Sequence, residues 1–69
     1  MPIENNIKMY RAKLDYTQED LAKRIEVTRQ TIISLEKGSY TPSLDLAFKL
    51  SELFQVPIEE IFYRVEDTK

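Results

Sequence analysis

The segment 29–37 carries side chains whose chemistry suits the recognition of a hydrogen-bonding surface. If it is a helix, with about 100° between successive residues, Ile32 and Leu35 point to one side. The opposite side carries Gln30, Ile33, Ser34 and Lys37, with Arg29 at the margin. In the major groove of duplex DNA, Arg pairs with guanine, Gln with adenine, and an apolar side chain touches the thymine methyl. The same pattern also fits a solvated helix face with one stray Ile, and composition alone does not decide between the two.

Several kinds of chemistry are excluded by composition. The 69 residues include no His and no Cys, so the usual zinc ligands, disulfides and the usual general base at neutral pH are missing. The single Gly cannot build a phosphate-cradling loop. The carboxylates, Lys and Tyr that remain have no recognisable catalytic spacing. We therefore expect no enzyme, no metal site, no cofactor and no small-molecule ligand.

The distribution of charge is more informative than its sum. The net charge is −2, but residues 1–40 carry seven Lys or Arg against six Asp or Glu, whereas residues 41–69 carry three against six. A basic surface can therefore be assembled only in the first part of the chain. The N-terminus lacks the pattern of a secretory signal, and no apolar run approaches the roughly 20 residues that span a bilayer. We expect a cytoplasmic protein without membrane contact.

Apolar residues recur at helical spacing between short runs rich in Pro, Gly and small polar residues. No strand-like alternation persists. The pattern predicts one all-α domain over residues 1–69. The expected helices are 4–14, 18–25, 29–37, 44–54 and 58–62, followed by a frayed tail at 64–69.

Residues typical of helix ends flank these ranges. Thr17 and Asp20 have the spacing of a capping box, in which each side chain bonds the other residue's backbone. Gly38 stands just past 29–37, where a residue with positive φ commonly closes a helix. Further end signals are Asp15 after the first helix, and Thr28, Ser43 and Pro57 at helix starts.

The second and third helices are joined by only about three residues, 26–28. Two short capped helices with so tight a joint cannot pack side by side, so they must cross at a large angle, as in a helix-turn-helix. The small side chain of Ala22 allows a close approach, and Ile32 fills the angle between the helices.

A resemblance to a known family covers almost the whole chain, from about Ile7 to Phe62. It is carried by the run TQEDLAKRIEVTRQTIISLEKGSYTPSLDLAFKL. This run resembles the helix-turn-helix family of phage Cro proteins and phage repressors, also called the xenobiotic-response-element family. The matching residues are Arg11, Gln18, Leu21, Ala22, Val27, Thr28, Gln30, Ile32, Leu35, Glu36, Gly38, Pro42 and Leu50.

The resemblance implies a five-helix, lambda-repressor-like DNA-binding domain, with its helix-turn-helix at the second and third helices. It also implies a sequence-specific regulator of transcription, a repressor, that binds double-stranded DNA. The late segment PSLDLAFKLSELFQVPIEEIF is similar to the compact subgroup that has no ligand-binding domain. The residues matching base-contacting positions are Arg29, Gln30, Ile33 and Ser34. Those matching phosphate-contacting positions are Gln18, Thr28, Lys37, Ser39 and Tyr40.

Two further positions carry an expectation. Arg11 and Glu36 match a family pair that forms a largely buried salt bridge, so we expect a structural role for Arg11; the alternative is an exposed Arg on a basic surface. Glu26 stands where the family often has Gly in the turn. A non-Gly residue with positive φ there costs about 1 kcal/mol, which predicts a slightly strained turn.

The segment 44–54 is apolar on more than one face. We expect Leu44, Ala47, Leu50 and Phe54 to serve the core. A symmetric homodimer is expected, because one helix-turn-helix reads few base pairs and such domains act on paired half-sites. The candidate interface residues are Leu46, Phe48, Leu53, Phe62 and Val65. The alternative is that these residues wrap a small core or remain singly exposed.

A different function class stays open at the level of sequence. The pI near 5.0 fits a protein-interaction module, such as an antitoxin or an adaptor that uses the same fold to bind a protein. The two classes differ in their response to salt, because binding through several phosphates weakens steeply as salt rises.

Overall fold

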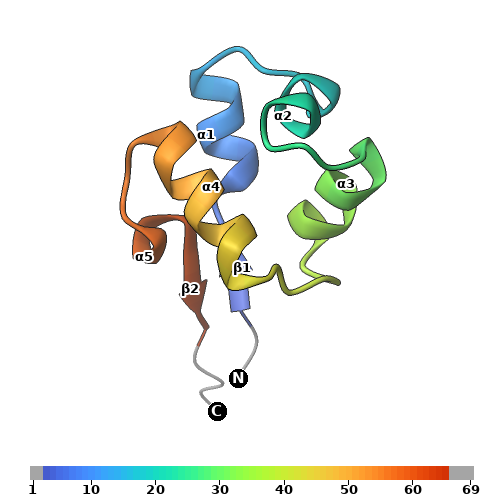
Figure 1. The fold of residues 1–69 in the computed structure, drawn as a ribbon. Coiled ribbons are helices and arrows are strands. Elements are labelled where there is room, and N and C mark those ends of the chain that lie inside the picture. The colour runs from blue at the N-terminus through green and yellow to red at the C-terminus, as the bar shows by residue number, and fades with distance from the viewer. Residues whose placement is uncertain (1–2, 66–69) are drawn as a thin grey trace.

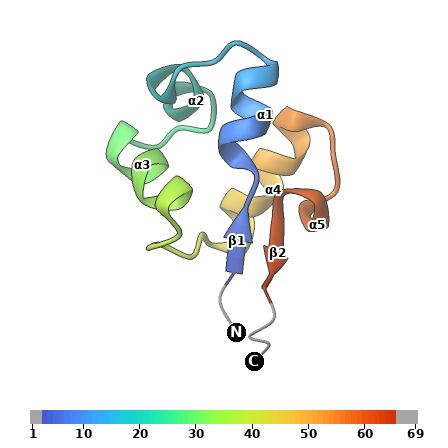
Figure 2. The same cartoon turned by 180° about the vertical axis from the view of Figure 1, so that it is seen from behind.

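The computed structural model describes residues 3–65 (Figures 1 and 2). In chain order the elements are β1 (Ile3–Asn5), α1 (Ile7–Lys13), α2 (Gln18–Arg24), α3 (Arg29–Lys37), α4 (Leu44–Phe54), α5 (Ile58–Ile61) and β2 (Phe62–Arg64). Helices α1 and α4 cross at the centre, with α2 and α3 on one side and α5 and β2 on the other. The five predicted helices are all present, so the mostly helical fold that the sequence indicated is confirmed.

Side-chain caps begin the three helices of the central segment. The Thr17 hydroxyl accepts the backbone N–H of Asp20, and the Asp20 carboxylate accepts the backbone N–H of Thr17, each at 3.0 Å. The Thr28 and Ser43 hydroxyls accept N–H groups at the starts of α3 and α4. Each cap satisfies a donor that the first turn of a helix leaves unpaired. The helix starts at 18, 29 and 44 follow from these local bonds.

The capping box lowers the pKa of Asp20, because its carboxylate accepts the backbone N–H and the hydroxyl of Thr17, with smaller contributions from Lys23 and Arg24. Such a group stabilises the fold above its unfolded pKa, and this stability is lost as the pH falls through the lower folded-state pKa. Below about pH 4 the protein should therefore lose stability through this group. Asp20→Asn keeps an acceptor for Thr17, so its melting temperature should fall less than the parent's between about pH 5 and 3. Parallel thermal melts with equal losses would contradict this.

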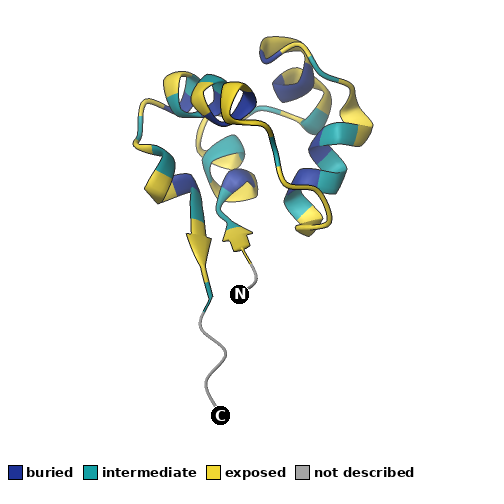
Figure 3. Ribbon diagram, turned by 60° about the horizontal axis from the view of Figure 1, so that its bottom comes forward, coloured by how far each residue is buried: buried dark blue, intermediate teal, exposed yellow. Residues whose placement is uncertain are grey.

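The core is drawn from all five helices. Its fully buried side chains are Ile7, Leu21, Ile32, Leu35, Leu50 and Ile61. At its edge the rings of Tyr10 and Phe54 stack with centroids 5.4 Å apart. Figure 3 shows the buried positions turned toward the space that the helices enclose. Burial of this apolar surface is the main source of stability in so short a chain.

A two-stranded antiparallel sheet was not predicted. The first helix was expected from residue 4, but residues 3–5 form β1, which pairs with β2 so that Asn5 lies opposite Phe62. The Asn5 side chain accepts the backbone N–H of Ile7 at 3.2 Å, so the helix starts only there. Asn favours such local bonds over helix interiors. Ile3, the first residue of β1, is 45% exposed.

Three other local expectations also need correction. The first helix was expected to end at Leu14, but α1 ends at Lys13 and Leu14 is 43% exposed. Phe62 was expected to end the fifth helix, but α5 ends at Ile61 and Phe62 begins β2. The tail was expected to fray from residue 64, but Arg64 pairs with Ile3 in the sheet. Residues 66–69 of that expected tail lie outside the described residues.

Helix α4 faces the core with a different stripe from the one expected. Leu46 is buried, at 7% exposure, and Leu44 is 70% exposed. The buried set of α4 is Leu46, Ala47, Leu50 and Phe54. The expected and the observed stripes share Ala47, Leu50 and Phe54. They differ at the start of the helix, where Leu46 is buried in place of Leu44, half a turn away. Helical periodicity alone cannot decide between these two positions. Leu46 is therefore part of the core and not of an interface.

Candidate nucleic-acid interface

A tight turn joins α2 to α3. After Arg24 the chain bends so that the N–H of Val27 donates to the carbonyl of Ala22 at 2.9 Å. Glu26 holds φ at 63°, in the left-handed region, as the resemblance indicated. Its carboxylate lies 3.5 Å from the ammonium of Lys49. The buried side chains of Ala22 and Ile32 allow the two helices to cross closely.

Replacing Glu26 with Gly should raise the free energy of unfolding by about 0.5–1 kcal/mol, because Gly adopts positive φ without the Cβ clash. The lost ion pair with Lys49 matters little, since the two side chains are 40% and 80% exposed. Glu26→Ala is the matched control: it loses the same ion pair and keeps the Cβ. Thermal melts should rank the Gly variant above the Ala variant, and the reverse order would contradict the strained turn.

Helix α3 has one buried side and one open side. Ile32 and Leu35 are 0% and 1% exposed and seat the helix on the core. On the other side Gln30 is exposed, and Ile33 and Ser34 are half-buried. Arg29, near the helix start, and Lys37, at its end, are exposed. The structure therefore brings the four expected base-contacting residues, Arg29, Gln30, Ile33 and Ser34, to one accessible helix.

The C-terminal end of α3 is closed by backbone bonds. Gly38 takes φ of 81°, and its N–H donates to the Leu35 carbonyl at 3.1 Å. The N–H of Ser39 donates to the Ser34 carbonyl at 3.1 Å, and the Ser39 hydroxyl donates to the same carbonyl at 3.4 Å. Lys37, Ser39 and Tyr40 all lie exposed around this end of the helix. They therefore lie exposed at the C-terminal end of the helix that carries Gln30, Ile33 and Ser34.

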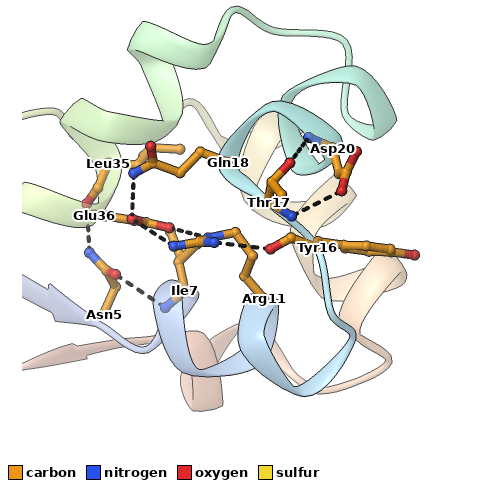
Figure 4. Close-up of polar contacts among 9 residues, drawn as sticks. All are labelled: Asn5, Ile7, Arg11, Tyr16, Thr17, Gln18, Asp20, Leu35 and Glu36. Atoms are coloured by element: carbon orange, nitrogen blue, oxygen red, sulfur yellow. Dashed lines mark hydrogen bonds and ion pairs between the residues drawn. The ribbon is translucent and has the colours of Figure 1, made fainter.

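A polar cluster joins α1, α2 and α3 (Figure 4). The Arg11 Nε donates to the Glu36 carboxylate at 2.8 Å, and the two side chains are only 15% and 10% exposed. A second Arg11 nitrogen donates to the Tyr16 carbonyl at 2.9 Å. The Gln18 Nε2 donates to the Glu36 carboxylate at 3.1 Å. Arg11 is thus engaged inside the protein and is not free on a basic surface.

Gln18 belongs both to this polar cluster and to the protein surface. Its carboxamide donates one N–H to Glu36, and a carboxamide has a second N–H to offer. It also lines a shallow surface hollow together with Thr17 and Arg29. The starts of α2 and α3 therefore share one surface, and Gln18 connects that surface to the buried ion pair.

Sequence reasoning did not single out Asn5. It placed Asn5 within the first helix, whereas the structure gives its carboxamide a bond to the Leu35 carbonyl, at 2.7 Å. The pair Asn5–Asn6 directly before Ile7 is a helix-start signal that could have moved the predicted boundary. Nothing local in the sequence indicates the bond to Leu35, because 30 positions separate the two residues.

The expected interface residues divide into two groups. Phe48 is 51% exposed and stands clear of the core. Leu53, Phe62 and Val65 are half-buried, and Leu53 and Phe62 pack against the core. Phe62 also lines a shallow apolar groove with Ile3, Leu44 and Ala47. Leu44, which has the highest exposed fraction of the apolar side chains in this region at 70%, was not among the expected set.

Within residues 3–65, no three His, Cys, Asp or Glu side chains gather closely enough to hold a metal ion. None of the helices over that range has the length and apolar character needed to cross a membrane.

The fold and the α2–α3 crossing define a helix-turn-helix domain of the five-helix type. The helix-turn-helix family model matches residues 7–61, so the chain belongs to the helix-turn-helix family of the Cro and phage-repressor type.

Similar proteins span archaea, bacteria and a phage. An uncharacterized HTH-type transcriptional regulator of Methanocaldococcus jannaschii is 55% identical over 94% of this chain and 98% of its own. The CTXphi phage transcriptional repressor RstR of Vibrio cholerae is 35% identical over 83% of this chain and 51% of its own. A crystal structure from Bacteroides fragilis, described as that of a putative DNA-binding protein, has a TM-score of 0.77 at 28% identity. It covers 88% of this chain and 98% of its own.

Proposed function

We propose that this chain is a transcriptional regulator that binds double-stranded DNA in a sequence-specific way, with α3 in the major groove. The observation that carries the proposal is the two-sidedness of α3. Ile32 and Leu35 are fully buried, while the side bearing Gln30 remains open to an incoming duplex. A major groove about 12 Å wide accepts a helix of this kind.

Each residue expected to contact DNA has an assigned role in the proposal. Arg29, Gln30, Ile33 and Ser34 contact base edges. Phosphates are contacted by Gln18 at the start of α2 and, at the two ends of α3, by Thr28, Lys37, Ser39 and Tyr40. The exposed fractions of these side chains support the assignment, since none is fully buried. The cation at Lys37 supplies the kind of charge that phosphate contacts need.

We also propose that the protein acts as a homodimeric repressor in the cytoplasm, where prokaryotic DNA lies. The repressor role is supported by the similarity to RstR, which is named as a transcriptional repressor. Dimerisation is supported by the short reach of a single helix-turn-helix, which reads only one half-site. The expected residues that keep exposed or half-buried surface for a second copy are Phe48, Leu53, Phe62 and Val65.

Selection of binding sites from a random pool of duplexes tests the proposal most directly. We expect a recovered motif of two half-sites with centres about one helical turn apart. Affinity for the recovered duplex should fall steeply with salt, because phosphate contacts release counterions. Recovery of no motif, together with binding that salt does not weaken, would reject DNA recognition and favour a protein partner.

The oligomeric state is tested by sedimentation of the protein with the recovered duplex. Two chains per duplex are expected, with the same stoichiometry at protein concentrations well above the dissociation constant. One chain per duplex at every protein concentration would reject the homodimer and leave DNA binding intact.

A further inference from the structure

Strand β1 lies against the C-terminal end of α3. The Asn5 Nδ2 donates to the Leu35 carbonyl at 2.7 Å, across 30 positions of the sequence (Figure 4). The carbonyl oxygen of Ile3 lies 3.9 Å from where a Cβ on Gly38 would stand. Together β1 and the end of α3 line a small polar hollow that includes Glu36 and Lys37. The strand is therefore in a position to hold this end of α3.

The Asn5 carboxamide bonds in two directions. Its oxygen accepts the backbone N–H of Ile7 at 3.2 Å and so starts α1. Its nitrogen donates to the Leu35 carbonyl, which also accepts the N–H of Gly38. Leu35 lies in the last turn of α3, where carbonyls lack partners within the helix. One side chain thus ties the start of α1 to the closing turn of α3.

Asn5 is itself held from the other side. In the sheet its backbone lies opposite Phe62. The next residue, Asn6, donates its backbone N–H to the Ile61 carbonyl at 2.8 Å and its side-chain nitrogen to the Glu60 carbonyl at 3.0 Å. A continuous set of bonds therefore runs from α5 and β2 through β1 to the last turn of α3.

We propose that Asn5 is a positioning residue for DNA binding, which acts through α3 and touches no DNA itself. The inference rests on the proposed function. Of the residues assigned to phosphates, Lys37 lies in the last turn of α3, which Asn5 holds, and Ser39 and Tyr40 follow it. Releasing the Leu35 carbonyl lets this end of α3 move, so the phosphate contacts at that end weaken while base contacts near Gln30 persist. The sheet of β1 and β2 therefore contributes to DNA binding by positioning the C-terminal end of α3.

The test compares Asn5→Asp with Asn6→Asp. Both substitutions add one negative charge and remove one side-chain donor. Asn5→Asp keeps the acceptor for Ile7 but loses the bond to Leu35, whereas Asn6→Asp loses only a bond to Glu60. The charge-free pair Asn5→Ala and Asn6→Ala removes the donors without adding charge; Asn5→Ala also removes the acceptor for Ile7, which Asn5→Asp keeps. All four variants and the parent are measured at a temperature where circular dichroism reports each one folded.

DNA binding and hydrogen exchange are both expected to distinguish the Asn5 variants from the Asn6 variants. Affinity for the duplex recovered by selection, measured by fluorescence anisotropy, should fall about tenfold in Asn5→Asp relative to Asn6→Asp. The slope of log affinity against log salt should become shallower by about one, because phosphate contacts at one end are lost. Base preference should be unchanged. In the free protein, the amides of Gly38 and Ser39 should exchange with deuterium faster in the Asn5 variants only.

The outcomes separate the inference from the proposed function. If the parent binds DNA and the Asn5 and Asn6 variants match in affinity and salt slope, Asn5 has no positioning role. If the parent binds no duplex, the proposed function fails, and hydrogen exchange still decides whether Asn5 holds the end of α3. If the Asn5 variants do not fold, the side-chain amide protons of Asn5 in the parent are followed by NMR. Exchange as fast as that of a free amide would overturn the inference.

Discussion

Glu36→Ala is expected to lower the free energy of unfolding by about 3 kcal/mol, the largest loss we predict for a single polar substitution. A chain of 69 residues has a total stability of only about 3–10 kcal/mol, so this loss removes about a third of it or more. The reason is the burial of the partner. Without Glu36, the Arg11 guanidinium keeps its bond to the Tyr16 carbonyl but has no counter-ion, and its side chain is 15% exposed.

The loss of unfolding free energy in Glu36→Ala should stay below the largest losses that follow from breaking a buried ion pair, because both side chains keep some contact with water. It is also not confined to the ion pair, since Gln18 donates to the same carboxylate. Arg11→Met should cost a similar amount. Its unbranched apolar chain can fill the space of the Arg stem, but it leaves the Glu36 carboxylate, 10% exposed, without a counter-ion and with only the bond from Gln18.

Glu26→Ala is the matched control for this prediction. It makes the same chemical change at an ion pair whose side chains are 40% and 80% exposed, so its effect should stay within about 0.5 kcal/mol. Chemical denaturation of the parent and both variants measures the difference. Equal losses at the two positions would mean that the Arg11–Glu36 pair stabilises the protein no more than a surface pair does.

The parts of the fold that the sequence predicted are those encoded locally. The starts of α2, α3 and α4 follow from Thr17, Thr28 and Ser43, each of which bonds an N–H group three residues ahead. The left-handed residue Gly38 closes α3 in the same local way. Capping is decided within a few residues, so the signal survives in the sequence without any knowledge of the fold.

The parts that were missed depend on distant partners. Strands β1 and β2 have three residues each and pair Ile3 with Arg64, so neither can display the alternation by which a strand is predicted. The choice between Leu44 and Leu46 depends on how α4 is rotated against its neighbours. The bond from Asn5 to Leu35 exists only because the sheet brings β1 to α3. In each case tertiary contacts, and not local propensity, decide the outcome.

Gln30→Ala should lower affinity for the selected site by about 5- to 100-fold and relax base preference at one position of each half-site. Gln30 is exposed on the open side of α3, one residue into the helix, where a carboxamide can bond an adenine edge. The Ala variant keeps the helix, because Ala has the highest helix propensity. The protein should therefore remain folded and keep its affinity for unrelated duplexes.

Lys37→Ala is the comparison variant for Gln30→Ala. Lys37 is exposed at the far end of the same helix and carries a charge but no base-specific geometry. Its loss should weaken binding to all sequences alike and reduce the salt slope by about one. Repeating the selection with each variant measures both effects. Relaxed preference in the Lys37 variant, with unchanged preference in the Gln30 variant, would mean that α3 lies in the groove in the opposite sense or that another element reads the bases.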